Sequence, residues 1–278
     1  MNLKDCSERA LADKIKALES KKQSYLDKDN LDKTFFIRCD GRSFKNFTRG
    51  FEKPFDEIFR ETMERTMIDL CKEVQGSILG FTQSDEITIM FKKNSEESEV
   101  YFNGKVQKIV SEVASVATLR FNANYIEVVN EHIKKDLEDA MNDFSNESDV
   151  ENVVKDLVNE SYKLYTDKFL KATFDARVFE IAREDELEPI IWRMLDCYKN
   201  AIQMIARTHF SQKQLHQKNI KDMEEMLKEK GIKIDSFESR NLYGKVCVKE
   251  PTLLYEGTDK ECVRNKWVRR DALDEIFK

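Results

Sequence analysis

The stretch FFIRCDGRSF, residues 35–44, places an aspartate, a glycine and an arginine directly after a run of strand-forming apolar residues. An ordinary buried strand would end in a simple turn, whereas Asp40 adds a carboxylate and Gly41 permits a close backbone approach. Further along, GFTQSDEITIMF, residues 80–91, has two apolar runs around the polar QSDE, which is typical of a β-hairpin. Acids therefore stand at the end of one predicted strand and, as Asp85 and Glu86, in a predicted hairpin.

The elements around these two stretches predict an α+β fold. Pro54 followed by Asp56 and Glu57 begins a helix, because proline is tolerated in the first turn and acids suit its dipole. Apolar residues recur at helical spacing over 106–117, and ATFDARVFEI, residues 172–181, is typical of another strand. The order strand–helix–hairpin–helix–strand is the ferredoxin-like order, so we expect an antiparallel sheet with helices on one face.

The remaining segments suggest a division of the chain. Two C-terminal helices are predicted over 187–210 and 218–231. Residues 134–168 hold five basic and ten acidic side chains without a strong apolar stripe, which indicates an acidic, helical surface insertion. The predicted organisation is one domain made of residues 1–133 and 169–250, the insertion 134–168, and a basic C-terminal tail, 251–278.

Composition excludes several classes of protein. With 40% hydrophobic and 36% charged residues, the 278-residue chain is typical of a soluble globular protein. No apolar run approaches the roughly 18–20 residues that span a bilayer, and the amino terminus does not resemble a secretory signal, so we expect a cytoplasmic protein without membrane association. The net charge of −6 does not by itself indicate a nucleic-acid binder, although locally basic stretches could still steer phosphates.

The acids suggest a metal site. If the first strand pairs beside the hairpin, Asp40 and Asp85 meet at one edge of the sheet, where carboxylate oxygens suit Mg²⁺ and two ions could assist phosphoryl transfer. Glycine at position 41 would let the backbone lie against a triphosphate, with Arg42 and Lys53 as candidate phosphate clamps. Such clusters also occur in ordinary turns. Spacing alone leaves both readings open, and does not separate nucleotidyl transfer from cyclisation or hydrolysis.

Several further motifs, taken in their order along the chain, support a nucleotide-binding function. IRCDGRSFKNFTRGFEKPFDEIF (37–59) and LGFTQSDEITIMF (79–91), followed by VQKIVSEVASVATLRFN (106–122), ATFDARVF (172–179) and the helices of 192–231, resemble the tRNA-His guanylyltransferase family. Members of that family add nucleotides in the 3′–5′ direction. The resemblance covers most of the chain from about residue 8 to residue 249, apart from the acidic insertion.

The resemblance implies a polymerase palm-like catalytic domain and assigns roles to individual residues. Asp40 and Asp85 would bind two Mg²⁺ ions together with the Gly41 carbonyl, and Glu86 would support this acidic centre. The implied nucleotide-binding residues are Gly41, Arg42, Ser43, Phe44, Lys45, Lys53 and Ser84. The residues implied to contact the RNA 5′ end or its phosphate are Lys199, Asn200, Lys218 and Asn219.

One difference from the eukaryotic members of the family narrows the implied function. Where eukaryotic members carry HINN, this chain has YKNA within DCYKNAIQM, so the histidine is absent. The sequence therefore resembles the bacterial and phage branch, whose members repair truncated tRNA 5′ ends by templated addition. ATP, GTP and other nucleoside triphosphates are the implied substrates, tRNA is the implied partner, and a homotetramer is expected. A strictly tRNA-His-specific guanylyltransferase and a non-catalytic palm-type RNA- or nucleotide-binding module remain alternatives.

Overall fold

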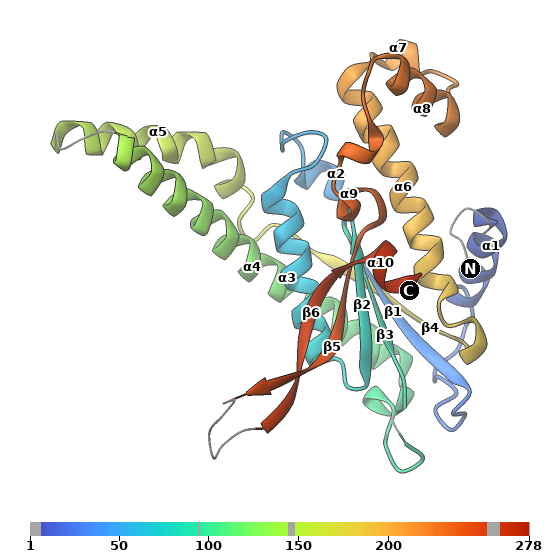
Figure 1. Cartoon of the computed structure of the whole chain (residues 1–278). Helices are drawn as coiled ribbons and strands as arrows, with labels where there is room; N and C mark the ends of the chain where they lie inside the picture. Colours follow the sequence, from blue (N-terminus) through green and yellow to red (C-terminus); the bar gives the residue numbers. More distant parts are fainter. Residues whose placement is uncertain (1–6, 94, 144–147, 255–261, 278) are drawn as a thin grey trace.

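The computed structural model describes residues 7–93, 95–143, 148–254 and 262–277. Its centre is an antiparallel sheet with the strand order β4–β1–β3–β2–β5–β6 (Figure 1). The strands are β1 (Lys33–Gly41), β2 (Ser77–Gln83), β3 (Glu86–Phe91), β4 (Phe174–Ala182), β5 (Lys245–Leu254) and β6 (Cys262–Asp271). The longer helices are α1 (Glu8–Glu19), α3 (Glu57–Glu73), α4 (Val106–Asp143), α5 (Ser148–Thr166), α6 (Glu188–His209) and α8 (Ile220–Glu229), and the short ones are α2 (Phe44–Phe47), α7 (Gln212–Leu215), α9 (Ser239–Tyr243) and α10 (Ala272–Ile276).

The predicted α+β fold is confirmed. The chain runs β1–α3–β2–β3–α4–β4, and these four strands lie in the order β4–β1–β3–β2, which is the ferredoxin-like arrangement. The tight β2–β3 turn makes those strands neighbours, while α3 and α4 return the chain across the sheet so that β1 lies between β3 and β4. β1 is thus a central strand.

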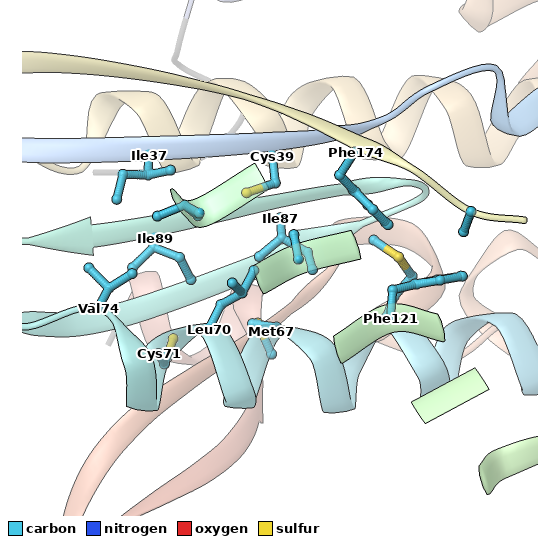
Figure 2. Packing of buried hydrophobic residues seen from close by; sticks show 14 of the residues in the cluster. Ile37, Cys39, Met67, Leu70, Cys71, Val74, Ile87, Ile89, Phe121 and Phe174 are labelled. Carbon is cyan, nitrogen blue, oxygen red and sulfur yellow. The ribbon is translucent and has the colours of Figure 1, made fainter. Parts of the chain in front are cut away.

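Alternation along β1 divides the core into two layers, because successive side chains point to opposite faces of a strand. The two crossover helices, α3 and α4, cover one face, and Figure 2 shows this packing from close by. Its members include Ile37 and Cys39 of β1, Ile87 and Ile89 of β3, Leu70 and Cys71 of α3, and Phe121 of α4. The opposite face, which carries Phe36 of β1, is covered by α1 and by the C-terminal helix α6. The site described below lies at one end of this sheet.

The predicted acidic insertion is helical where the structure describes it. Helix α4 runs without interruption from Val106 to Asp143, so residue 134 lies inside a helix that begins on the sheet. Helix α5 returns antiparallel to α4, and the pair projects from the body of the molecule (Figure 1). Residues 144–147 at the predicted tip lie outside the described residues. The division into domain, insertion and tail stays a prediction.

The predicted basic tail contributes a strand. β6 pairs with β5 from Lys245↔Asp271 to Leu254↔Cys262, and β5 joins the sheet beside β2. These strands were not anticipated, because β6 is an edge strand whose described side chains are exposed or half-buried and therefore lack apolar alternation. None of the described helices is both long and apolar enough to cross a bilayer.

Candidate functional site

The two predicted metal-binding carboxylates meet at one edge of the sheet. Asp40 is the penultimate residue of β1 and stands opposite Glu86 in the β1–β3 register. The next backbone N–H, of Gly41, donates to the carbonyl oxygen of Asp85 at 3.0 Å. The end of β1 is therefore bonded directly to the β2–β3 turn, which brings Asp40 beside Asp85 as the sequence predicts.

The turn itself has an unusual backbone. Ser84 has a φ of 49°, in the left-handed region that a serine rarely adopts. Its hydroxyl donates to the Asp85 carboxylate, from Oγ to Oδ1 at 3.0 Å. Backbone held in this region by its surroundings is often found at functional sites. The turn thus fixes the carboxylate of Asp85 at the end of the sheet.

Burial and a neighbouring negative charge raise the pKa of both carboxyls. For Asp85 the larger cause is desolvation and the next is the charge of Asp40. For Asp40 the larger cause is again burial, followed by the charge of Asp175 on β4. Neither Asp40 nor Asp85 forms an ion pair with a side chain among the described residues. Paired carboxylate oxygens without a cation are donors that suit a divalent ion such as Mg²⁺, so the site fits that group.

Glu86 occupies a different environment from the two aspartates. Its carboxylate forms an ion pair with the Nη2 of Arg193 on α6 and accepts from Nε2 of Gln83 at 2.9 Å. Burial raises the pKa of Glu86, and the positive charge of Arg193 opposes this effect. Arg193 also bonds Asp196 at 3.0 Å and lies over the Trp192 ring. Glu86 therefore joins the hairpin to α6, and its predicted catalytic role stays a prediction.

A cleft of 410 Å³ opens beside Asp85. Its walls come from the segment 44–64, the β2–β3 turn, α6 and the region of α9. The predicted site residues that line it are Phe44, Lys45, Lys53, Ser84, Asp85 and Asn200. Much of the remaining lining is apolar, including Phe55 and Met204. A concave, partly apolar cleft with a few polar groups is the usual form of a small-molecule site.

The cations of the cleft fall into two groups. Lys45 and Lys53 are exposed and have no ion-pair partner in the part of the chain that the structure describes. Arg207 donates a hydrogen bond to the neutral side chain of Gln203, from Nη2 to Oε1 at 3.5 Å, and pairs with no carboxylate in the described residues. Arg60 and Arg240, in contrast, are bound to carboxylates of α3 and of the segment before α9. The first group can meet a phosphate without giving up a carboxylate partner.

Sequence reasoning missed four cations of this lining. These are Arg60, Arg207, Arg240 and Lys245. Arg240 and Lys245 come from α9 and the start of β5, which carry no local motif, so only the fold could place them beside the hairpin. Arg207 was within reach, because it stands two helical turns after Asn200 on the same helix.

Other predicted residues lie outside the cleft lining. Gly41 stands next to it, and a Cβ there would meet the Phe44 ring at 2.4 Å, which explains the glycine. Arg42 and Ser43 are exposed; the N–H of Arg42 donates to the carbonyl of Thr173, and Ser43 has a φ of 58°. Asp40, at the end of β1, does not line the cleft. Of the seven predicted nucleotide-binding residues, Phe44, Lys45, Lys53 and Ser84 therefore line the cleft, whereas Gly41, Arg42 and Ser43 do not.

The four predicted RNA-end residues are not brought together. Asn200 lines the cleft, whereas Lys199 forms an ion pair with Glu8 of α1. Asn219 caps α8 by accepting from the N–H of Asp222, at 3.0 Å, and Lys218 beside it is exposed. The described structure therefore shows three different surroundings for these residues, and their contact with RNA stays a prediction.

Comparison with known proteins places this geometry in context. A family model described as tRNAHis guanylyltransferase matches residues 12–182, more than half of the chain. An uncharacterized protein of Acanthamoeba polyphaga mimivirus is 33% identical over 230 residues, covering 79% of this chain and 70% of that protein. A probable tRNA(His) guanylyltransferase of Dictyostelium discoideum is 33% identical over 98 residues, covering 34% of this chain and 37% of its own length.

Solved structures give the same fold. A bacterial tRNA(His) guanylyltransferase-like protein in complex with ATP matches with a TM-score of 0.63 and 28% identity, over 92% of this chain and 91% of the other. A second bacterial structure of this kind, in complex with GTP, has a TM-score of 0.62 at 24% identity over 95% and 92% of the two chains, and so supports the fold alone.

Proposed function

Because the chain belongs to the tRNAHis guanylyltransferase family, we propose that it is a nucleotidyltransferase that adds nucleotides in the 3′–5′ direction to tRNA 5′ ends, directed by the opposite strand. The observation that carries this proposal is the pair Asp40 and Asp85, held without a cation partner among the described residues beside a cleft with unpaired lysines. A binding-only module has no evident need for two carboxylates that repel each other.

The nucleotide would lie in the cleft with its triphosphate toward Lys45, Lys53 and Arg207. Asp40, Asp85 and the Gly41 carbonyl are the groups that would hold Mg²⁺, most simply as two ions. When bound, such ions neutralise charge on the attacking and leaving oxygens of a phosphoryl displacement. The apolar lining at Phe55 and Met204 would receive the base and exclude water from its face.

Two reactions account for addition to a monophosphorylated end. In the first, an oxygen of the RNA 5′-phosphate attacks the α-phosphate of ATP or GTP, and pyrophosphate leaves. In the second, the 3′-hydroxyl of an incoming nucleotide attacks the activated 5′-phosphate, and AMP or GMP leaves. The side chains named above would bind and orient the triphosphate so that the attacking oxygen lies in line with the leaving group. A triphosphorylated end would enter at the second reaction.

The ATP-bound bacterial relative supports the choice of nucleotide. At 28% identity over most of both chains, its ligand is a fair guide to what this cleft accepts. The absence of a histidine at Tyr198–Ala201 favours general repair over strict tRNA-His specificity. We further propose a homotetramer, which light scattering coupled to gel filtration would test.

The experiment uses tRNA that lacks its first 5′ nucleotide, labelled at the 5′-monophosphate, with Mg²⁺, ATP and all four nucleotides. We expect extension by the base that pairs with the acceptor strand, in both tRNA-His and another tRNA. Extension of tRNA-His alone would favour the specific guanylyltransferase instead. If neither a monophosphorylated nor a triphosphorylated end is extended, the tRNA-repair proposal is wrong.

A further inference from the structure

The wall of the cleft that carries Lys53 is the segment 48–56, here called the cleft loop, which joins α2 to α3. Most of its residues line the cleft, and Lys53 projects from it without an ion-pair partner in the described chain. Behind the loop lies the C-terminal end of α5, which belongs to the acidic insertion. The insertion, whose role the sequence leaves open, therefore reaches the back of the proposed nucleotide site.

One buried carboxylate fixes the shape of the cleft loop. Asp56 is 6% exposed and accepts three hydrogen bonds. Its Oδ1 accepts from the N–H of Phe59 at 2.8 Å, which caps α3. Its Oδ2 accepts from the N–H of Glu52 at 3.0 Å and from the hydroxyl of Tyr165 at 2.7 Å. The side chain of Asp56 thus connects α3, the cleft loop and the insertion. Because Glu52 immediately precedes Lys53, this connection reaches the backbone next to the lysine.

Further contacts hold the cleft loop against α5. The ring of Phe51 stacks on the ring of Tyr165, with centroids 4.9 Å apart and planes at 26°. Gly50 has a φ of +91°, and a Cβ there would lie 3.0 Å from a methyl carbon of Leu164. Tyr165 is itself fixed, because its carbonyl oxygen accepts from the hydroxyl of Tyr125 at 3.2 Å. The cleft loop therefore packs against Tyr165, a residue whose backbone is itself held by a hydrogen bond.

We propose that Tyr165 is a positioning residue for the nucleotide: through Asp56 and Phe51 it holds the cleft loop in the form that presents Lys53 to the triphosphate. This inference rests on the proposed function. Without the hydroxyl, Asp56 would keep two of its three donors, and the loop segment at Glu52 and Lys53 would sample more conformations. Each binding event would then have to restrict the lysine again, which weakens affinity for the triphosphate.

The test compares Tyr165→Phe with a matched control, Tyr162→Phe. The hydroxyl of Tyr162 also bonds a carboxylate at 2.7 Å, Asp136 on α4, and makes no hydrogen bond to the cleft loop among the described residues. Both substitutions remove one tyrosine–aspartate hydrogen bond that involves the insertion. Thermal unfolding should report the larger stability loss for Tyr165→Phe, because Asp56 is buried and Asp136 is exposed. Binding of ATP with Mg²⁺ would be measured by calorimetry, and binding of truncated tRNA by filter retention.

We expect Tyr165→Phe to weaken ATP binding on the order of tenfold while tRNA binding changes less than about twofold, and Tyr162→Phe to leave both near wild type. In a Lys53→Ala background the additional loss from Tyr165→Phe should nearly vanish, because the two residues act on one interaction. Equal ATP affinity in wild type and Tyr165→Phe would overturn the positioning role alone. Failure of the wild-type chain to bind any nucleoside triphosphate would overturn the proposed function as well.

Discussion

The ion pair between Arg193 and Glu86 offers a quantitative test of how the site is held together. Arg193 is 8% exposed, and its guanidinium bonds Glu86 of the hairpin while lying over Trp192. Replacing it by methionine, Arg193→Met, keeps most of the apolar stem but leaves Glu86 without its cation. Removing one partner of a buried ion pair costs about 3–5 kcal/mol, because the other charge stays buried. Glu86 keeps its hydrogen bond from Gln83, so we expect about 3 kcal/mol.

The pH dependence has a defined sign. Burial already raises the pKa of Glu86, and the charge of Arg193 opposes that rise, so the substitution moves the folded-state pKa further up. A carboxyl whose folded-state pKa exceeds its unfolded value stabilises the fold when protonated, and this contribution is lost as the pH rises. The free energy of unfolding lost by Arg193→Met should therefore be larger at about pH 8 than at about pH 5.

The assay is urea unfolding at both pH values in EDTA, with a double-mutant cycle. Glu86→Gln in the Arg193→Met background should restore stability to within about 1 kcal/mol of wild type, because no charge is then left buried. Arg65→Met is the control: Arg65 pairs with the exposed Glu131 and with Glu61, which keeps Arg269 as a second partner, so the loss should be about 1 kcal/mol or less. A loss below about 1 kcal/mol for Arg193→Met, equal at both pH values, would refute the reasoning.

Three further outcomes concern the cleft. Asp85→Asn should reduce the rate of nucleotide addition to below about one-hundredth of the wild-type rate, and near-normal turnover would contradict the metal assignment. Without Mg²⁺, the same substitution should raise the free energy of unfolding by up to about 1 kcal/mol, because it removes repulsion with Asp40. The apparent Mg²⁺ affinity, measured by calorimetry, should fall as the pH is lowered, because protons compete for carboxyls whose pKa is raised; a pH-independent affinity would place the ion elsewhere. Lys53→Ala should raise the KM for ATP more than the Kd for tRNA, and equal changes would mean that Lys53 does not contact the triphosphate.

The central fold was accessible from the sequence because its signals are local. The apolar run before Asp40 and the pattern around Ser84 and Asp85 specify a strand and a hairpin, and a βαββαβ order restricts how they can pair. The β5–β6 pair was not accessible, because a proline such as Pro251 is unfavourable in a strand and charged residues are frequent in β6. Such an edge strand is specified by its partner and not by its own pattern.

The candidate site, like the fold, has residues whose positions the sequence could predict and residues whose positions it could not. Asp40 and Asp85 were predictable because each lies at a recognisable strand end. Lys199 and Asn200 were predicted as a pair, yet adjacent residues on a helix point about 100° apart. One therefore bonds Glu8 of α1 and the other lines the cleft. Adjacency in sequence is a poor guide to shared function on a helix, whereas adjacency across a sheet edge is a good one.

The pairing of the cleft cations gives a physical reason for assigning the triphosphate to Lys53 and its neighbours. Arg240 contacts Glu57, Glu64 and Glu238, so its charge is already neutralised within the protein. A phosphate that approached Arg240 would compete with these carboxylates and would be repelled by them. An approach from the side of Lys53 meets an ammonium group that has no ion-pair partner among the described residues, and Asp85 of the negative Asp40–Asp85 pair lines the same cleft. A bare triphosphate would be repelled by that pair, whereas one carrying divalent cations would be drawn toward it. Under the proposed function, we therefore expect this arrangement to favour a metal-bound nucleotide over a free one, which is the form that the proposed reaction needs.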